Sequence, residues 1–296
     1  MNSEMIDSPA APDPSPNVES LLEQTMLDIG IPPRPRILDS ITEETRKPEP
    51  DYNRLASLIN ADVSLSAGLI KIANSPYFGM RQRVRSVNEA LMVLGLNVAS
   101  RAIAGIVLRQ ALPISPRMER FWDASARVAR LSGWLAQQLR VAGLQPEDAY
   151  TFGLFRDCGI PILLTRFPNY DEVLGVANHN ARHSFTTVEE TVLPTNHAMV
   201  GCLLAQSWWL PDELCQAIRN HHDLAKLESA EPQLLVSNRL SAVAQFAEHL
   251  VQQHLGLSQT QEWTKLGPAC LRLLDLEEQQ LAELYSESLP VAKADD

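Results

Sequence analysis

The stretch SPRMERFWDASARVARLSGWLAQQLRVAG, residues 115–143, decides the fold class of this chain. Ser115 followed by Pro116 is typical of a helix start, because serine caps free backbone N–H groups and proline fits the first helical turn. Apolar side chains then recur at intervals of three and four residues, and Gly143 is a residue type that commonly follows a helix end. The stretch therefore predicts one long amphipathic helix. Its apolar stripe consists of Phe121, Ala124, Val128, Leu131, Leu135 and Leu139.

The same signals recur along the rest of the chain. Ser86-Val-Asn-Glu89 and Thr187-Val-Glu-Glu190 have the capping-box spacing, and Gly95 is expected to turn the chain between two helical segments. No segment alternates apolar and polar residues in the pattern of a strand. The predicted fold class is therefore all-α, with many short and medium helices. Further helix starts are expected at Asp51, Gln145-Pro146, Asn169 or Tyr170, Asn196, Pro211, Pro232 and Ser258.

Composition suggests how the chain is divided. Residues 1–16 contain four prolines among small and acidic residues, which predicts a disordered N-terminus. We expect one main domain over residues 17–256, built from two helical lobes at about 17–114 and 115–256. Residues 257–296 are expected to form a C-terminal helical extension with an acidic tail.

The net charge of −11 is carried by the two ends of the chain. Residues 1–30 hold six acidic residues and no basic one, and residues 271–296 hold seven acidic and two basic residues. The remaining residues 31–270 balance at 23 of each sign. Acidic ends on a neutral centre favour solubility and disfavour bulk binding of nucleic acid.

Nothing in the sequence predicts a membrane segment or a secretory signal. The long uncharged stretch 191–211 is interrupted by Pro194 and several polar residues, and the N-terminus has neither a basic region nor an apolar core. The four cysteines are widely spaced without a C-x-x-C pair, which is typical of buried reduced thiols. We therefore expect a cytoplasmic protein.

Arginine is concentrated in one part of the chain. Residues 81–130 contain nine arginines against three acidic residues, and arginine is the side chain best suited to bind phosphate or carboxylate. Arg81, Arg83 and Arg85 are thus candidates for binding a phosphate group or a partner. A solvated surface is the alternative, because arginine is common throughout the chain.

Histidines and one aspartate are the candidates for chemistry. His197 opens an apolar helix, His221 and His222 end an amphipathic one, and Asp157 lies in the apolar stretch GLFRDCGIPILL. A buried carboxylate needs a partner, which neutral imidazoles or a metal ion could supply, and buried polar groups that tie helices together are the alternative. His179 and His183 are expected on a solvated helix face instead. No nucleophile elbow, Walker loop or dinucleotide fingerprint is present.

Several segments together resemble a known family. IPPRPRIL (31–38) and the run from DYNRLASLIN to ALMVLGL (51–96), which contains ANSPYFG, are similar to the N-terminal half of an HDOD domain. FWDASARVARLSGWLAQQL, DAYTFGLFRDCGIPILL and NHAMVGCLLAQSWWLPDELCQAIRNHHD resemble its second, HD-related lobe. The resemblance spans about residues 30–250. It implies a multi-helix fold in which an N-terminal helical lobe packs on an HD-like lobe.

The resemblance also implies what the site has lost. Catalytic HD and HD-GYP phosphohydrolases hold metal ions through histidines and aspartates, and HDOD proteins are regarded as relatives without that site. Here Ala124 falls at the position of the early histidine, Arg156 replaces the histidine of the His-Asp pair, and the last aspartate falls near Glu248. Neither alanine nor arginine ligates a metal. The remnant pocket consists of Arg156, Asp157, His197, His221 and His222, of which all but Arg156 match the HD pattern. We expect a metal-free cluster there, in which Arg156 or a protonated histidine pairs with Asp157.

We therefore expect no catalytic residues, no bound metal and no cofactor. The resemblance implies a stand-alone bacterial regulatory protein that acts on signalling proteins by contact, in a pathway that could involve cyclic di-GMP. Two alternatives remain open. One is a residual metal-dependent phosphohydrolase, and the other is a nucleotide-binding regulator that takes a small phosphorylated ligand.

Overall fold

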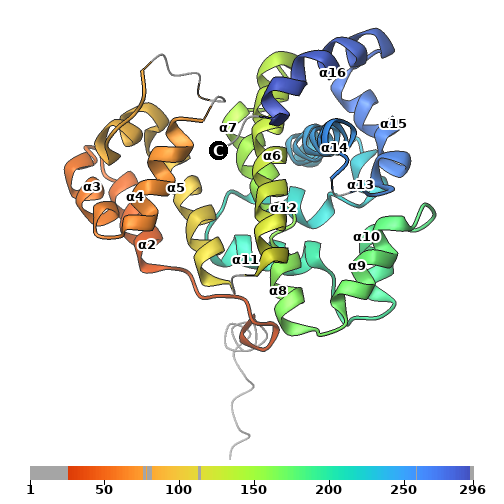
Figure 1. Cartoon of the computed structure of the whole chain (residues 1–296), viewed down its shortest axis with the longest axis horizontal. Coiled ribbons are helices and arrows are strands. Elements are labelled where there is room, and N and C mark those ends of the chain that lie inside the picture. The colour runs from red at the N-terminus through yellow and green to blue at the C-terminus, as the bar shows by residue number, and fades with distance from the viewer. Residues whose placement is uncertain (1–25, 76–77, 79–81, 113–114, 258, 294–296) are drawn as a thin grey trace, which may run out of the picture.

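The computed structural model describes residues 26–75, 78, 82–112, 115–257 and 259–293. Within these ranges every regular element is a helix, which confirms the all-α prediction. The helices form a smaller lobe from the first third of the chain and a larger lobe from the rest (Figure 1). The predicted disorder of residues 1–16 lies outside the described residues.

The smaller lobe is built around one long helix. Helices α2 (Arg36–Thr45), α3 (Tyr52–Asn60) and α4 (Val63–Ala73) all pack against α5 (Val87–Ala111). Asp51 caps α3 as predicted, because its carboxylate accepts the backbone N–H of the third helical residue at 3.0 Å. The lobe contributes one part of an apolar core that continues into the larger lobe. The buried centre of that core includes Leu55, Ile59, Leu69 and Ile103.

Helix α5 is two helices joined at a glycine. Gly95 has φ 70° and ψ 165°, so the chain turns there as predicted. At its start, Ser86 caps the Glu89 N–H, while the Glu89 carboxylate accepts from Arg85 instead of from Ser86. By length and composition α5 would pass as a membrane span, but a core helix passes the same test, and here its apolar face is buried.

The larger lobe is organised around α6 (Pro116–Leu139), which runs through the middle of the molecule (Figure 1). Helices α7 (Pro146–Phe155) and α14 (Leu235–Leu255) pack along it. The predicted helix end at Gly143 is wrong by four residues. Arg140 adopts the left-handed conformation with φ 48° and ends α6, so Gly143, also at positive φ, serves the loop that follows.

The remaining elements place the ends of several helices close to α7. Asn169, Asn196, Pro211 and Pro232 all lie at or next to helix starts, as predicted. The predicted capping box at Thr187 is wrong, because Ser184 caps that helix one turn earlier. The elements are α8 (Gly159–Arg166), α9 (Tyr170–His179), α10 (Phe185–Glu190), α11 (His197–Ser207), α12 (Asp212–Asn220), α13 (Leu224–Leu227) and η2 (Pro232–Leu234).

Two C-terminal helices complete the larger lobe. Helix α15 (Glu262–Leu274) packs on α14, and α16 (Glu278–Lys293) packs on α6 and α14. Ser258, the predicted start of α15, lies outside the described residues, and the helix begins at Glu262. The segment predicted as an extension thus contributes to the same core.

Candidate functional site

Asp157 lies at the centre of the candidate site, in the turn between α7 and α8. Helix α7 ends at Phe155 and α8 begins at Gly159, so the carboxylate projects from a short connection between two helices. Gly159 is required by packing, because an added Cβ there would stand 2.0 Å from the carbonyl oxygen of His197. This close approach brings the turn against the start of α11.

One oxygen of Asp157 faces a fixed cation. Arg156 Nη2 lies 2.8 Å from Asp157 Oδ2, and the same guanidinium donates to both oxygens of Glu248 at 2.8 and 3.1 Å. Burial by itself lowers the pKa of Arg156, but Asp157 and Glu248 raise it above its usual value. We call this arrangement of Arg156, Glu248 and Asp157 Oδ2 the guanidinium side.

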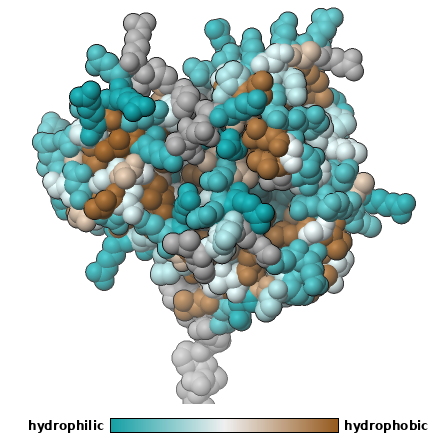
Figure 2. Space-filling model, in the orientation of Figure 1, coloured by the Kyte–Doolittle hydropathy of each residue, from teal (hydrophilic) through white to brown (hydrophobic). Residues whose placement is uncertain are grey.

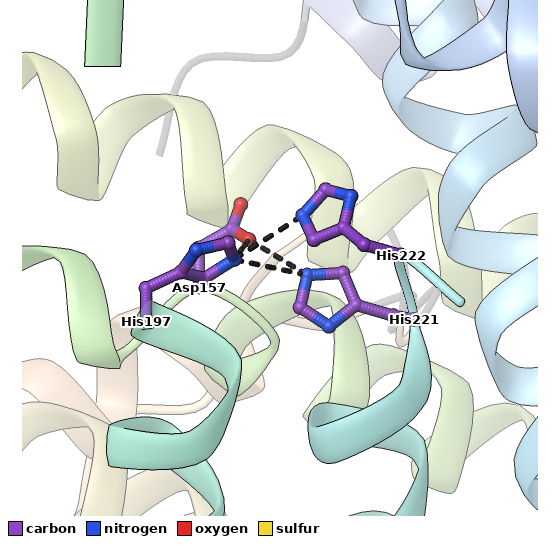
Figure 3. A group of neighbouring side chains, drawn as sticks. All are labelled: Asp157, His197, His221 and His222. Atoms are coloured by element: carbon purple, nitrogen blue, oxygen red, sulfur yellow. Dashed lines mark hydrogen bonds and ion pairs between the residues drawn. The ribbon is translucent and has the colours of Figure 1, made fainter. Parts of the chain in front are cut away.

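The other oxygen of Asp157 faces three imidazoles (Figure 3). His197 is the first residue of α11, and His221 and His222 directly follow α12. Asp157 Oδ1 lies 3.2 Å from His221 Nε2 and 3.6 Å from His197 Nε2. His197 Nε2 in turn lies 3.3 Å from His221 Nε2 and 3.2 Å from His222 Nε2. We call this arrangement the imidazole side.

Each imidazole is oriented by an acceptor at its other nitrogen. His197 Nδ1 bonds to the carboxylate of Glu189 at 2.8 Å, and His222 Nδ1 bonds to that of Glu262 at 2.6 Å. His221 Nδ1 bonds to the carbonyl oxygen of Ile218 at 2.7 Å. Because these oxygens only accept, each Nδ1 carries the hydrogen. The three Nε2 atoms that converge are therefore lone-pair acceptors when the rings are neutral.

Burial controls the protonation of the site. Burial opposes ionisation of Asp157, yet Arg156 and His221 hold its pKa below the usual value. Burial lowers the pKa of His197 on its own, but Glu189 raises it above the usual value. Burial, with the nearby His221 and His197, lowers the pKa of His222 well below its usual value. His222 therefore keeps the lone pair of Nε2 at neutral pH.

A cavity of about 650 Å³ adjoins the imidazole side at His222 and Glu262. Its walls carry as many carboxylates as cations, so they do not select a phosphate over another polar ligand. The charged lining residues are Arg182, Arg219, Lys265, Glu190, Asp223 and Glu262.

The structure brings together the whole predicted remnant: Arg156, Asp157, His197, His221 and His222. It does not bring the candidate arginines there. Arg83 and Arg85 are exposed ahead of α5, and Arg81 lies outside the described residues. Ala124 is half-buried on α6 and offers no ligand atom.

His179 and His183 do not share a helix, because α9 ends at His179, and both side chains are exposed as expected. Sequence reasoning missed Glu189 and Glu262, which orient His197 and His222. Glu189 carried a weak signal, since it belongs to the segment read as a capping box. Glu262 carried none, because only the packing of α15 on α13 and α14 reveals its role.

The described residues thus form a two-lobe helical protein with a buried cluster of histidines around an aspartate. The HDOD domain model matches residues 31–224, and the chain belongs to the HDOD domain family. The family predicted from the sequence is thereby confirmed.

Curated relatives share only part of their length with this chain. An uncharacterised protein of Treponema pallidum is 28% identical over 200 residues, which are 66% of this chain and 38% of the relative. YuxH of Bacillus subtilis, also uncharacterised, is 33% identical over 63 residues, 21% of this chain and 15% of YuxH. The chain therefore spans well under two thirds of either relative.

Solved structures share the fold. An HDOD domain protein of unknown function from Geobacter sulfurreducens has TM-score 0.59 at 21% identity, covering 93% of this chain and 99% of that one. A protein named "putative phosphohydrolase" from Shewanella amazonensis SB2B has TM-score 0.66 at 21% identity, covering 92% and 95%. One named "putative signal transduction protein" from Marinobacter aquaeolei VT8 has TM-score 0.66 at 21% identity, covering 92% and 59%.

Proposed function

We propose that this chain is a regulatory module of bacterial signal transduction that acts through contacts with other proteins and does not hydrolyse phosphate esters. Membership of the HDOD family and the name given to the Marinobacter neighbour support the signalling role. The proposal that the chain does not hydrolyse phosphate esters rests on the guanidinium side.

The family resemblance places Arg156 where HD-related hydrolases have a histidine ligand, and its guanidinium bonds to both Asp157 and Glu248. Metal-assisted hydrolysis needs an ion with a coordination position open to water and substrate. A cation held by bonds of 2.8–3.1 Å occupies these carboxylates and repels a second ion. We therefore expect no water-activating metal centre at this side.

The first test is hydrolysis. Purified protein is assayed with Mn²⁺ or Fe²⁺ on bis(p-nitrophenyl) phosphate and on cyclic di-GMP, beside Asp157→Asn and the exposed-histidine control His179→Ala. We expect the three proteins to give the same background rate. A metal-dependent rate that is lost in Asp157→Asn and kept in His179→Ala would establish the phosphohydrolase alternative.

Protein contact has a candidate residue in Trp209. Its side chain is 62% exposed, its backbone is at φ 59°, and the guanidinium carbon of Arg34 lies 4.0 Å from its ring centre. A bulky residue at positive φ is uncommon, and exposed tryptophan is enriched at interfaces. The face drawn in Figure 2 shows separate apolar patches among hydrophilic side chains.

The second test places a photo-crosslinking amino acid at Trp209 and, as a control, at Val176, which is 60% exposed on α9. Crosslinking is carried out in the source bacterium. We expect a defined product with a signalling protein from position 209 and none from position 176. Equal, nonspecific products from both positions would contradict the assignment of this surface. Binding of a nucleotide or another small phosphorylated ligand stays a prediction.

A further inference from the structure

We propose that His197, His221, His222 and Asp157 bind one divalent transition-metal ion, zinc by preference, in a closed four-ligand site that stabilises the larger lobe. This site does not depend on the proposed function, because a closed ion has no position for water or substrate. Loss of metal binding and gain of hydrolysis are measured separately.

The orientation of the imidazoles is the first observation. All three Nδ1 atoms donate to fixed oxygens, so the three Nε2 atoms present lone pairs to one another at 3.2–3.3 Å. Asp157 Oδ1, also an acceptor, completes the group at 3.2 Å from His221. When the rings are neutral, four acceptors face one point and repel each other, and a cation at that point satisfies them all.

The spacing is the second observation. A tetrahedral zinc ion with bonds of about 2.0–2.1 Å separates its ligand atoms by about 3.3–3.4 Å. Four of the six distances between the ligand atoms are 3.2, 3.2, 3.3 and 3.6 Å, and all four atoms lie within 4.8 Å of one another. Three imidazoles and one carboxylate are also ligands that zinc accepts. These four distances are close to those of the tetrahedral ion.

The buried charge is the third observation. Six charged side chains bond to one another or to the imidazoles, and with neutral imidazoles four negative charges against two positive leave −2. A divalent ion brings this sum to zero, and burial makes such compensation valuable. The six are Asp157, Glu189, Glu248, Glu262, Arg156 and Lys265.

The surroundings of the ligands are those of a built site. Glu189 accepts from the hydroxyl of Tyr170 and from both the backbone N–H and Nδ1 of His197, and its side chain is fully buried. Carboxylates that hold the far nitrogen of a ligating histidine fix its orientation and raise its basicity. The charge of Arg156 opposes a cation at the imidazoles, since it lowers the pKa of His197 and His222, but the guanidinium bonds to Oδ2 of Asp157 and leaves Oδ1 facing the imidazoles.

The location predicts the role of the ion. Its ligands come from the α7–α8 turn, the start of α11 and the end of α12. An ion held by all three segments stabilises their packing and binds the folded state in preference to the unfolded chain. The site is therefore structural.

The experiment uses full-length protein purified without a metal-affinity tag and stripped with a chelator. Zinc and, as a spectroscopic probe, Co²⁺ are then added. We expect one equivalent of zinc by mass spectrometry, the visible absorption of tetrahedral Co²⁺, and a higher Tm than in the chelator. Binding of less than a tenth of an equivalent with micromolar zinc in excess would overturn the proposal, and protons would then be the occupants of the cluster.

Variants separate this site from incidental binding. His222→Ala is expected to lose the stoichiometric ion, while His179→Ala and His183→Ala keep it, because those two side chains are exposed elsewhere. Retention of one equivalent in His222→Ala would also overturn the proposal. If His222→Ala does not fold, Glu262→Gln decides, since it leaves all four ligands in place and is expected to weaken zinc binding about 10–100-fold. An unchanged affinity in Glu262→Gln would count against the site.

Discussion

The two oxygens of the Asp157 carboxylate lie in two different electrostatic environments. On the guanidinium side, a buried cation is supplied by the chain itself, through the bonds of Arg156 to Asp157 and Glu248. On the imidazole side, three oriented rings converge near Oδ1 of Asp157. One oxygen thus bonds to a cation of the chain itself, and the other faces the ion site that we propose.

The two sides differ in what holds their side chains in place. The guanidinium of Arg156 bonds to Oδ2 of Asp157, and its charge also lowers the pKa of His197 and of His222. The orientation of the imidazoles depends on Glu189, Glu262 and the carbonyl of Ile218, none of which contacts Arg156 through a recorded bond. The hydrogen bonds of one side can thus be removed while those of the other side stay in place.

The largest expected effect comes from removing the chain's own cation. Arg156→Met leaves Asp157 and Glu248 buried without their partner, and such a break costs about 3–5 kcal/mol of unfolding free energy. Urea unfolding in chelator measures this loss. Arg156→Met combined with Glu248→Gln is expected to recover part of it, because one uncompensated charge is removed. A loss below about 1 kcal/mol would mean that the guanidinium side is effectively solvated.

The next largest effect is expected from the hydrogen bond that holds Glu189 on the imidazole side. Tyr170→Phe removes a hydroxyl that donates to Glu189 in the fully buried interior, and a hydrogen bond to a charged group contributes about 1.5–3 kcal/mol. Tyr285→Phe, on the half-exposed Tyr285 of α16, is the matched control and is expected to change little. Equal losses in the two variants would show that Glu189 does not need this donor.

The close packing of α8 against the start of α11 depends on Gly159. Gly159→Ala forces a Cβ toward the His197 carbonyl and is expected to cost about 1–3 kcal/mol, because backbone atoms cannot yield as side chains do. Gly175→Ala on α9 meets no atom within 4 Å and is expected to stabilise by about 0.4–1 kcal/mol. Chemical unfolding of both variants gives the contrast. Similar values for the two glycines would contradict the close approach of α8 and α11.

The smallest expected effect is an absence of reaction. Burial raises the pKa of Cys215 and of Cys270 to about 12, and burial together with Asp157 raises that of Cys158 further. A thiol reagent at pH 8 is therefore expected to modify none of the four buried cysteines before denaturant is added. Rapid modification of Cys158 in the chelator but not in zinc would show that the imidazole side opens when it is empty.

Helix positions could largely be predicted from the sequence because their signals are local. Asp51, Ser86, Ser115 and Asn196 all cap the helices expected of them. Predictions failed where two local signals compete, as at Thr187, where Ser184 is the better-placed cap. The helix end at Arg140 was missed because a non-glycine residue adopts the left-handed conformation there.

The sequence by itself determined the helical class, the family and the residue types at the site, because caps, periodicity and motif spacing act over a few neighbouring positions. Tertiary structure alone decided that Arg156 bonds to Glu248, 92 positions away, and that Glu262 holds His222, 40 positions away. Which atoms meet depends on how α8, α11, α12 and α15 pack together. The direction of the three imidazoles follows from that packing. The ion site that we propose depends on the same packing.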